Sequence, residues 1–195
     1  MKYLNRISDL REIMFAHTEE EELVNHVLDN PCFPICSGSS KPHQHHYGDG
    51  GLQHHTWEVV NFCVQNGDML YRLGHKIDME VLLLAALYHD FGKIWDYKLL
   101  ADGTWGSGYH KRMIHHISRS GIEWTNALRT KGSQDAQSIE SNVLHCILSH
   151  HCERAWGSPV GPKTREAWTL FLCDGLSARG NDCCSNDRYS YGELF

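Results

Sequence analysis

Histidine is unusually frequent in this sequence, and its distribution suggests chemistry. The chain has 15 histidines, and several stand beside another histidine or an aspartate at the end of an apolar pattern with helical spacing. A helical bundle that directs such side chains to one point can bind a metal ion, because the ion offsets the desolvation cost of buried polar groups. In chain order, these sites are His54 and His55, His89 and Asp90, His115 and His116, His150 and His151, and Asp174.

The doublet of His89 and Asp90 is the clearest of these sites. It closely follows the segment VLLLAAL (81–87), which is apolar nearly all round, as in a helix buried on most of its sides. A single histidine in such a place is more often a hydrogen-bonded structural residue than a metal ligand. Because five separated sites share this placement, chance is a poor explanation, and we expect a metal centre.

The elements that must position these residues have the periodicity of helices. A β-hairpin is expected only around the Asp-Gly turn within residues 94–108, so the expected fold class is an all-α helical bundle with a small hairpin. Thr18 and Asp78 are candidate N-caps, and Gly92 is expected to end the helix that contains VLLLAAL. Residues 30–50 should be irregular, and helices are expected within 1–29 (two), 51–74, 78–90 and about 109–129, 137–151 and 162–179.

The composition is that of an ordinary soluble globular protein. The 195 residues are 41% hydrophobic and 22% charged with a net charge of -6, so no overall positive field draws the chain to nucleic acid or to anionic membranes. We expect a single domain over 1–195, with N-terminal helices in 1–30, a core over about 41–180 and a loose tail in 181–195.

No segment of the sequence looks like a membrane span or a secretory signal. No stretch reaches the roughly 18 apolar residues that a membrane helix needs, and the first residues lack the apolar core of a signal peptide. We therefore expect a cytoplasmic protein whose eight cysteines are free thiols rather than disulfides.

The order and spacing of the motifs resemble the HD-domain superfamily of metal-dependent phosphohydrolases. Its pattern is a histidine, a His-Asp doublet, one or two further histidine sites and a distant aspartate. A closer resemblance, over roughly residues 41–180, is to the catalytic domain of the YhaM-type 3'-5' exoribonucleases. The segments that carry it are HHYGDGGLQHHT (45–56), ALYHDFGKIWD (86–96), ILSHHCERAWGSPVGPKTREA (147–167) and LCDGLSAR (172–179).

The resemblance implies a centre of two divalent metal ions. Superfamily members with a doubled histidine at the fourth site resemble two-metal enzymes, and this chain has the doubled site. Imidazole and carboxylate ligands together suit Mn, Fe, Co, Ni or Zn better than Mg, and two such ions could activate water for attack on phosphorus. One ion would be held by His55, His89, Asp90 and Asp174, and the other by His116, His150 and His151, with Asp90 as the bridge.

Three residues near the motifs are further candidates for catalysis, beside Asp90. Lys93 would contact the phosphate or stabilise the leaving oxygen, although a solvated structural lysine is an equal alternative. His45 and His46 lie on the loop before the first ligand helix, where the resemblance places active-site residues. They are candidates to donate to the phosphate or to act as a general acid.

The segment ERAWGSPVGPKTREAW (153–168) is a candidate nucleotide clamp. Trp156 would stack on a base, while Arg154, Lys163 and Arg165 would hold phosphate. The alternative is a tryptophan packed in the core and cations that are merely solvated.

These features together predict a hydrolase that cleaves a phosphoester of a nucleotide or a short oligonucleotide. YhaM-type enzymes also carry an N-terminal barrel of the OB type, and no strand-rich segment precedes the helices here, so we expect a short substrate rather than long RNA. Two alternatives are a phosphohydrolase or triphosphohydrolase of monomeric nucleotides and a metal-binding regulatory module without activity. A structural zinc site at Cys32, Cys36, His43 and His45 is a weaker alternative, because its spacing departs from the tighter zinc patterns.

Overall fold

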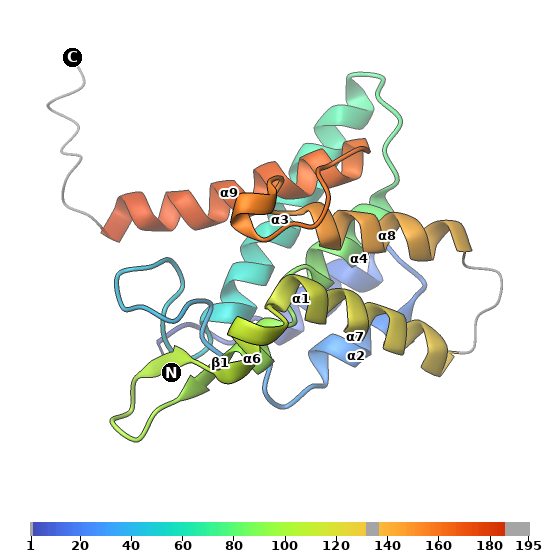
Figure 1. Cartoon of the computed structure of the whole chain (residues 1–195). Coiled ribbons are helices and arrows are strands. Elements are labelled where there is room, and N and C mark those ends of the chain that lie inside the picture. Colours follow the sequence, from blue (N-terminus) through green and yellow to red (C-terminus); the bar gives the residue numbers. More distant parts are fainter. Residues whose placement is uncertain (1, 132–136, 186–195) are drawn as a thin grey trace, which may run out of the picture.

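A computed structural model describes residues 2–131 and 137–185 of the chain. Within these residues, helices surround one central helix, α4, and one small hairpin lies at the edge of the bundle, which confirms the expected fold class (Figure 1). In chain order, the elements are α1 (Ile7–Phe15), α2 (Glu21–Leu28), α3 (Gly51–Arg72), α4 (Met79–Tyr88), α5 (Lys93–Asp96), β1 (Tyr97–Leu99), β2 (Trp105–Ser107), α6 (Tyr109–Met113), α7 (His116–Lys131), α8 (Gln137–Ser149), the 3-10 turn η1 (Arg154–Trp156) and α9 (Arg165–Ser185).

The central helix α4 is buried on every side, as its sequence predicts. Asp78 caps it, since its Oδ1 accepts a hydrogen bond from the backbone N–H of Val81 at 3.1 Å. The side chains from Val81 to Tyr88 are all buried, and α4 contacts α2, α3, α7, α8 and α9. The residues that follow α4 are therefore held in the interior of the bundle.

Gly92 does not end α4, contrary to the expectation, because the helix already ends at Tyr88. The glycine has an ordinary helical φ of -58°. Its importance is steric: a Cβ at this position would lie 2.3 Å from the backbone oxygen of His116. Gly92 therefore lets the chain after α4 approach the start of α7.

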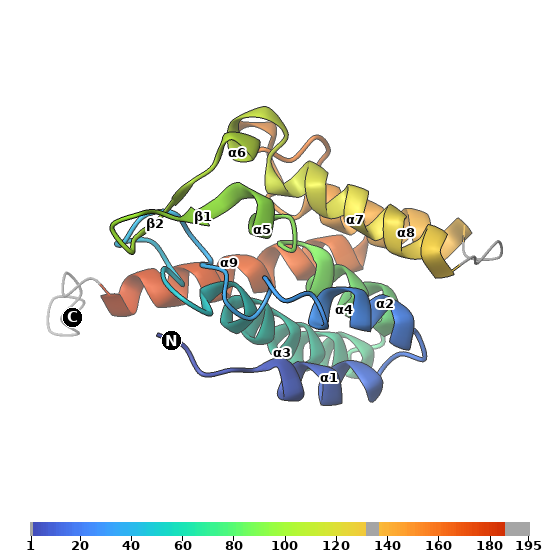
Figure 2. The same cartoon turned by 90° about the horizontal axis from the view of Figure 1, so that it is seen from below.

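Two pairs of helices enclose the centre. The long helices α3 and α9 pack against each other on one side of α4, and α7 packs against α8 on another (Figures 1 and 2). The antiparallel hairpin pairs Tyr97 with Ser107 and Leu99 with Trp105. Figure 2 shows the hairpin and the irregular loop between α2 and α3 at the same end of the molecule.

Several helix boundaries differ from those expected. Thr18 does not cap α2, because the N-cap of that helix is Glu20. The Thr18 hydroxyl instead accepts a hydrogen bond from the backbone N–H of Glu20 and donates one to Glu80. The helix expected over 109–129 is two helices, α6 and α7, because His115 takes a positive φ of 70° between them. Such a conformation is incompatible with a continuous right-handed helix.

The last two long helices also differ at their ends. The helix α8 ends at Ser149, before the two histidines that were expected inside it. The helix α9 begins three residues after Pro162 and runs to Ser185 instead of ending near 179. The remainder of the expected tail, residues 186–195, lies outside the described residues. Among the helices of the described part of the chain, none combines the length and the apolar character needed to cross a membrane.

Candidate metal centre

The structure brings the seven expected metal ligands together in two adjoining sets. Within each set, one ligand atom from every residue lies within 4.8 Å of the others. The first set is His55, His89, Asp90 and Asp174, and the second is His116, His150 and His151.

Asp90 faces both sets with different oxygens. Its Oδ2 lies 3.2 Å from Nε2 of His55 and 3.4 Å from Nε2 of His89. Its Oδ1 lies 3.3 Å from Nε2 of His116 and 3.7 Å from Nε2 of His150. Each oxygen of this carboxylate therefore faces a different ligand set.

Most of the ligand residues lie at or just after the end of a helix, and Asp174 lies within one. His55 lies in the first turns of α3, Asp174 lies within α9, and His116 is the first residue of α7. The other ligands directly follow buried helices: His89 and Asp90 follow α4, and His150 and His151 follow α8. Because the core holds α4 and α8 rigidly, their ends place these side chains with little freedom.

Three of the five histidines are bonded to backbone carbonyl oxygens through Nδ1, each at 2.7 Å. A carbonyl only accepts, so Nδ1 must carry the proton, and the neutral ring then presents Nε2 as a lone pair. The pairs are His89 with Ala86, His150 with Ile147, and His151 with Trp156.

His55 is also protonated at Nδ1, through a contact with a serine. The Ser177 hydroxyl donates to Oε2 of Glu58 at 2.7 Å, so it accepts from Nδ1 of His55 at 2.9 Å. The sequence analysis did not single out Ser177 or Glu58. Ser177 lies three residues after Asp174, and Glu58 lies three residues after His55. This helical spacing from two expected ligands is the signal that could have identified them.

Three buried atoms where the sets meet have no hydrogen-bond partner: Oδ1 of Asp90, Nε2 of His116 and Nε2 of His150. A buried acceptor without a donor is costly, and facing acceptors repel each other. A cation between these atoms would relieve both costs. The donor set therefore fits divalent metal ions on the chemistry of its own atoms.

The charges of this cluster are strongly coupled. Burial would raise the pKa of Asp90, but the ammonium of Lys93, 2.5 Å from its Oδ2, and the neighbouring histidines hold that pKa well below its usual range. Burial would lower the pKa of His55, but hydrogen bonds to Asp174 and Asp90 raise it. A metal ion would therefore compete with a proton for Nε2 of His55.

The two loop histidines that were expected to be catalytic have different surroundings. His45 lines the cavity above the centre, whereas His46 is buried behind it, with Nε2 3.1 Å from Oε2 of Glu58. Burial, opposed by the bond to Glu58, lowers the pKa of His46 to about 4. Burial, the positive charge of Lys93 and the neighbouring His55 lower that of His45 to about 3, so both rings are neutral at pH 7.

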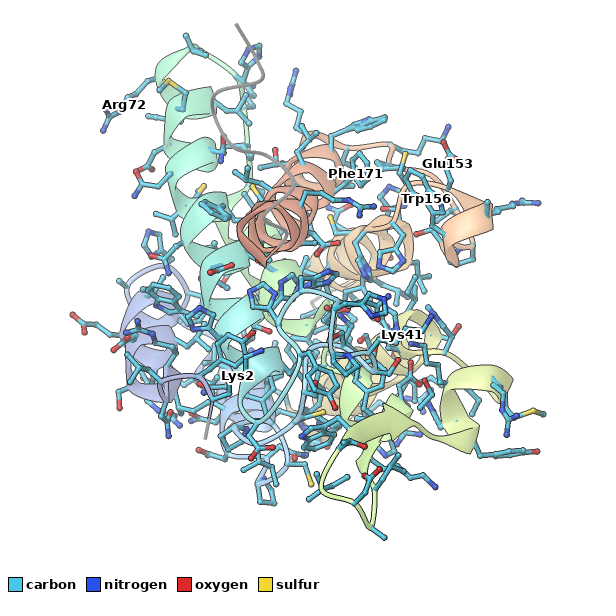
Figure 3. The ribbon with its side chains drawn as sticks, turned by 90° about the vertical axis from the view of Figure 1, so that its left-hand side faces the viewer. Lys2, Lys41, Arg72, Glu153, Trp156 and Phe171 are labelled. Carbon is cyan, nitrogen blue, oxygen red and sulfur yellow. The ribbon has the colours of Figure 1, made fainter. Side chains whose placement is uncertain are left out.

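A cavity of about 550 Å³ opens onto the centre. Besides ligands of both sets, it is lined by Lys93 and Trp156, as expected, and by Gln44, Phe171 and Arg179, which the sequence analysis missed. Phe171 lies three residues before Asp174 on α9, and this helical spacing is the signal that could have identified it, whereas Arg179, five residues after Asp174, has no such spacing. Figure 3 shows Phe171 close to Trp156.

The expected cations of the clamp do not lie in this cavity. Lys163 and Arg165 line a neighbouring cavity of about 730 Å³ between α3 and α9, and Leu172 lines both cavities. Arg154 is exposed and lines neither. Of the four proposed substrate-binding residues, only Trp156 adjoins the metal centre directly.

The cysteines of the described residues are free thiols, as expected, while Cys183 and Cys184 lie outside the residues whose side chains are described. Cys32 is exposed and Cys36 is buried, and burial raises the pKa of the Cys36 thiol to about 12. Among the described residues, neither cysteine belongs to a group of side chains able to hold a metal. This geometry does not favour the structural zinc site.

Comparison with known proteins agrees with the arrangement of the site. The model of the family described as HD domain matches residues 52–179. The chain is 30% identical over 142 residues to the 3'-5' exoribonuclease YhaM of Bacillus subtilis, which covers 70% of this chain and 41% of that protein. It is 30% identical over 138 residues to the protein of the same name from Shouchella clausii, covering 70% of this chain and 40% of that protein.

A third YhaM exoribonuclease, from Halalkalibacterium halodurans, is 28% identical over 137 residues, or 70% of this chain and 40% of that protein. The chain thus spans about two fifths of the length of the curated relatives it matches. No solved structure matches.

Proposed function

Because the chain belongs to the HD domain family, we propose that it is a metal-dependent phosphodiesterase that removes nucleotides from the 3' end of a short single-stranded RNA. The observation that carries this proposal is the junction of the two ligand sets at Asp90, whose oxygens face one set each. The names of the relatives support the substrate class, since they are 3'-5' exoribonucleases.

The residues present would hold two divalent ions. His55, His89 and Asp174 would hold one, His116, His150 and His151 the other, and Asp90 would bridge them. Five imidazoles favour Mn, Fe, Co, Ni or Zn over Mg. Ions bound here would supply Lewis-acid polarisation of the phosphoryl oxygens and activation of water at neutral pH.

The side chains around the cavity suit a nucleotide. Its volume of about 550 Å³ lies within the usual range for small-molecule sites, roughly 300–1,000 Å³. Trp156 is 57% exposed and offers a ring face on which a base can stack, while Lys93 and Arg179 bring positive charge for phosphate.

His45 is a further polar group in the lining of the cavity, together with Gln44 and Lys93. Because its ring is neutral at pH 7, it would bind the substrate through its single N–H or accept a proton. It would not arrive as an imidazolium acid. Donation of this N–H to the phosphate is one of the two roles that the sequence suggested, and the general acid is the other.

The test combines metal analysis with product analysis. The purified protein, loaded in turn with Mn, Co or Ni, is incubated with 5'-labelled RNA and DNA oligomers, a cyclic nucleotide and deoxynucleoside triphosphates. We expect nucleoside 5'-monophosphates from the 3' end of RNA, and a loss of at least 100-fold in rate for Asp90→Asn, which retains the shape of the bridge without its charge. Mass spectrometry should find two ions per chain in the wild type.

Other outcomes would overturn the proposal. Hydrolysis of the triphosphates alone would establish the monomeric-nucleotide alternative. Metal binding without turnover of any substrate would support the regulatory module. A fully active Asp90→Asn variant would exclude this centre as the catalytic site.

A further inference from the structure

Asp96 is a buried carboxylate outside the expected ligand sets. It is the last residue of α5 and has 0% of its surface exposed. Its ion-pair partners among the described residues are imidazoles rather than a lysine or an arginine. A fully buried carboxylate is costly unless it is paired and hydrogen-bonded, so its position calls for a specific role.

The two oxygens of Asp96 contact the first residue of α7 and a residue of α6. Oδ2 accepts from the backbone N–H of His116 at 2.9 Å and lies 3.3 Å from Nδ1 of the same residue. Oδ1 lies 2.7 Å from Nδ1 of His110. One carboxylate thus holds His116 at both its backbone and its ring.

This double contact suits the local backbone. His116 begins α7, so its N–H has no partner inside the helix, and a negative charge is favoured at a helix N-terminus. Because a carboxylate can only accept, Nδ1 of His116 must carry the proton. Its Nε2 is then left as a lone pair, 3.3 Å from Oδ1 of Asp90.

We propose that Asp96 is a positioning residue for the second ligand set: it fixes the ring orientation and the tautomer of His116, and thereby controls binding of the ion held by His116, His150 and His151. This inference rests on the proposed function. The first set does not depend on Asp96, since His55 is supported by Ser177 and His89 by a backbone carbonyl. Asp96 should therefore affect one ion and spare the other.

Two substitutions separate orientation from charge. Asp96→Ala removes both acceptors, whereas Asp96→Asn can still offer one oxygen to His116 if its amide faces His110. Carboxylates placed behind ligand histidines typically change metal affinity by about 10- to 100-fold. We expect losses of roughly 100-fold for Ala and 10-fold for Asn at one of two Co²⁺ binding steps, measured by calorimetry, with the other step unchanged.

A matched control is Glu123→Gln, which lies on α7, the helix that begins at His116. Glu123 is also a buried carboxylate, paired with Arg119 at 2.9 Å and with His26 at 3.4 Å, and neither of these partners belongs to a ligand set. This variant should bind Co²⁺ as the wild type does. A similar loss in Glu123→Gln would show that disturbing α7 is enough, which would overturn the role of Asp96.

The wild-type protein offers a test that does not depend on a variant folding. Nitrogen-15 NMR of the metal-free protein should show His116 protonated at Nδ1 and not at Nε2. The opposite tautomer would overturn the proposal, as would an Asp96→Ala variant that folds and binds both ions at wild-type affinity. These results would leave the proposed function standing, whereas a wild type that binds no metal and cleaves no substrate would remove that function itself.

Discussion

Lys93 has surroundings that differ from both interpretations of the sequence. The sequence left a phosphate contact and a solvated structural lysine equally open, and the residue does line the cavity. Its ammonium also lies 2.5 Å from Oδ2 of Asp90, and both side chains are buried. Burial opposes the charge of Lys93, but Asp90 outweighs it and raises the lysine pKa above its usual value. Lys93 therefore compensates the buried charge of the Asp90 carboxylate.

We predict that Lys93→Met destabilises the metal-free protein much more than the metal-loaded one. Removal of one partner from a buried ion pair leaves the other charge uncompensated, which costs about 3–5 kcal/mol. Bound metal would neutralise Asp90 in its place and reduce that loss. Urea unfolding with and without Mn²⁺ measures the difference, and the exposed Lys98→Met is the control. An equal loss in both conditions would mean that Lys93 and the metal do not share Asp90.

The sequence pattern predicts some residues of the site and gives no sign of others. The ligands are visible because histidine and aspartate are rare at the ends of buried helices and here recur in order. Their supporting residues are ordinary in type: Ser177 is 122 positions from His55, and Asp96 is 20 positions from His116. These contacts form only in the folded chain. The local sequence pattern could therefore identify the ligands but not the residues that orient them.

At the scale of elements, periodicity predicted which segments are helical, but not how the helices end. The break at His115 separates α6 from α7 and makes His116 the first residue of a helix, where its free N–H meets Asp96. Neither the positive φ of His115 nor the close approach of Gly92 has a periodic signature. Both depend on the packing of the chain after α4 against α7.

We predict that Gly92→Ala disturbs the metal centre through this contact. The added Cβ would lie 2.3 Å from the His116 oxygen and 2.9 Å from its Cα, so the backbone must move. A clash of this kind costs about 1–3 kcal/mol, and Co²⁺ affinity should fall because His116 is displaced. The control is Gly180→Ala in α9, where a Cβ meets nothing within 4 Å and should be neutral or stabilising. Wild-type Co²⁺ affinity in a folded Gly92→Ala variant would contradict the prediction.

At the scale of the whole molecule, two cavities lie next to each other and share one lining residue. The first opens onto the metal centre, the second lies between α3 and α9, and Leu172 lines both. The chain has a net charge of -6, so an RNA strand must be held by local cations. Lys163 and Arg165 are two such cations, although Glu166 also lines their cavity. The sequence suggested these cations as candidate substrate contacts, but it could not show that they line a cavity separate from that of the metal centre.

We therefore predict that Lys163 and Arg165 matter only for substrates long enough to pass Leu172. The double variant Lys163→Gln with Arg165→Gln should cleave a dinucleotide like the wild type. Its KM for a ten-nucleotide RNA should rise roughly 5- to 30-fold, since each exposed charge contact contributes about 0.5–1 kcal/mol. The salt dependence of that KM should also weaken, because fewer counterions are released from the strand.

The control, Lys98→Gln with Arg72→Gln, removes the same charge from exposed positions that line neither cavity, and it should leave the cleavage of both substrates unchanged. Equal effects of the first double variant on both lengths would place these cations at the catalytic cavity instead, and no effect on either would mean that the strand leaves the centre by another route.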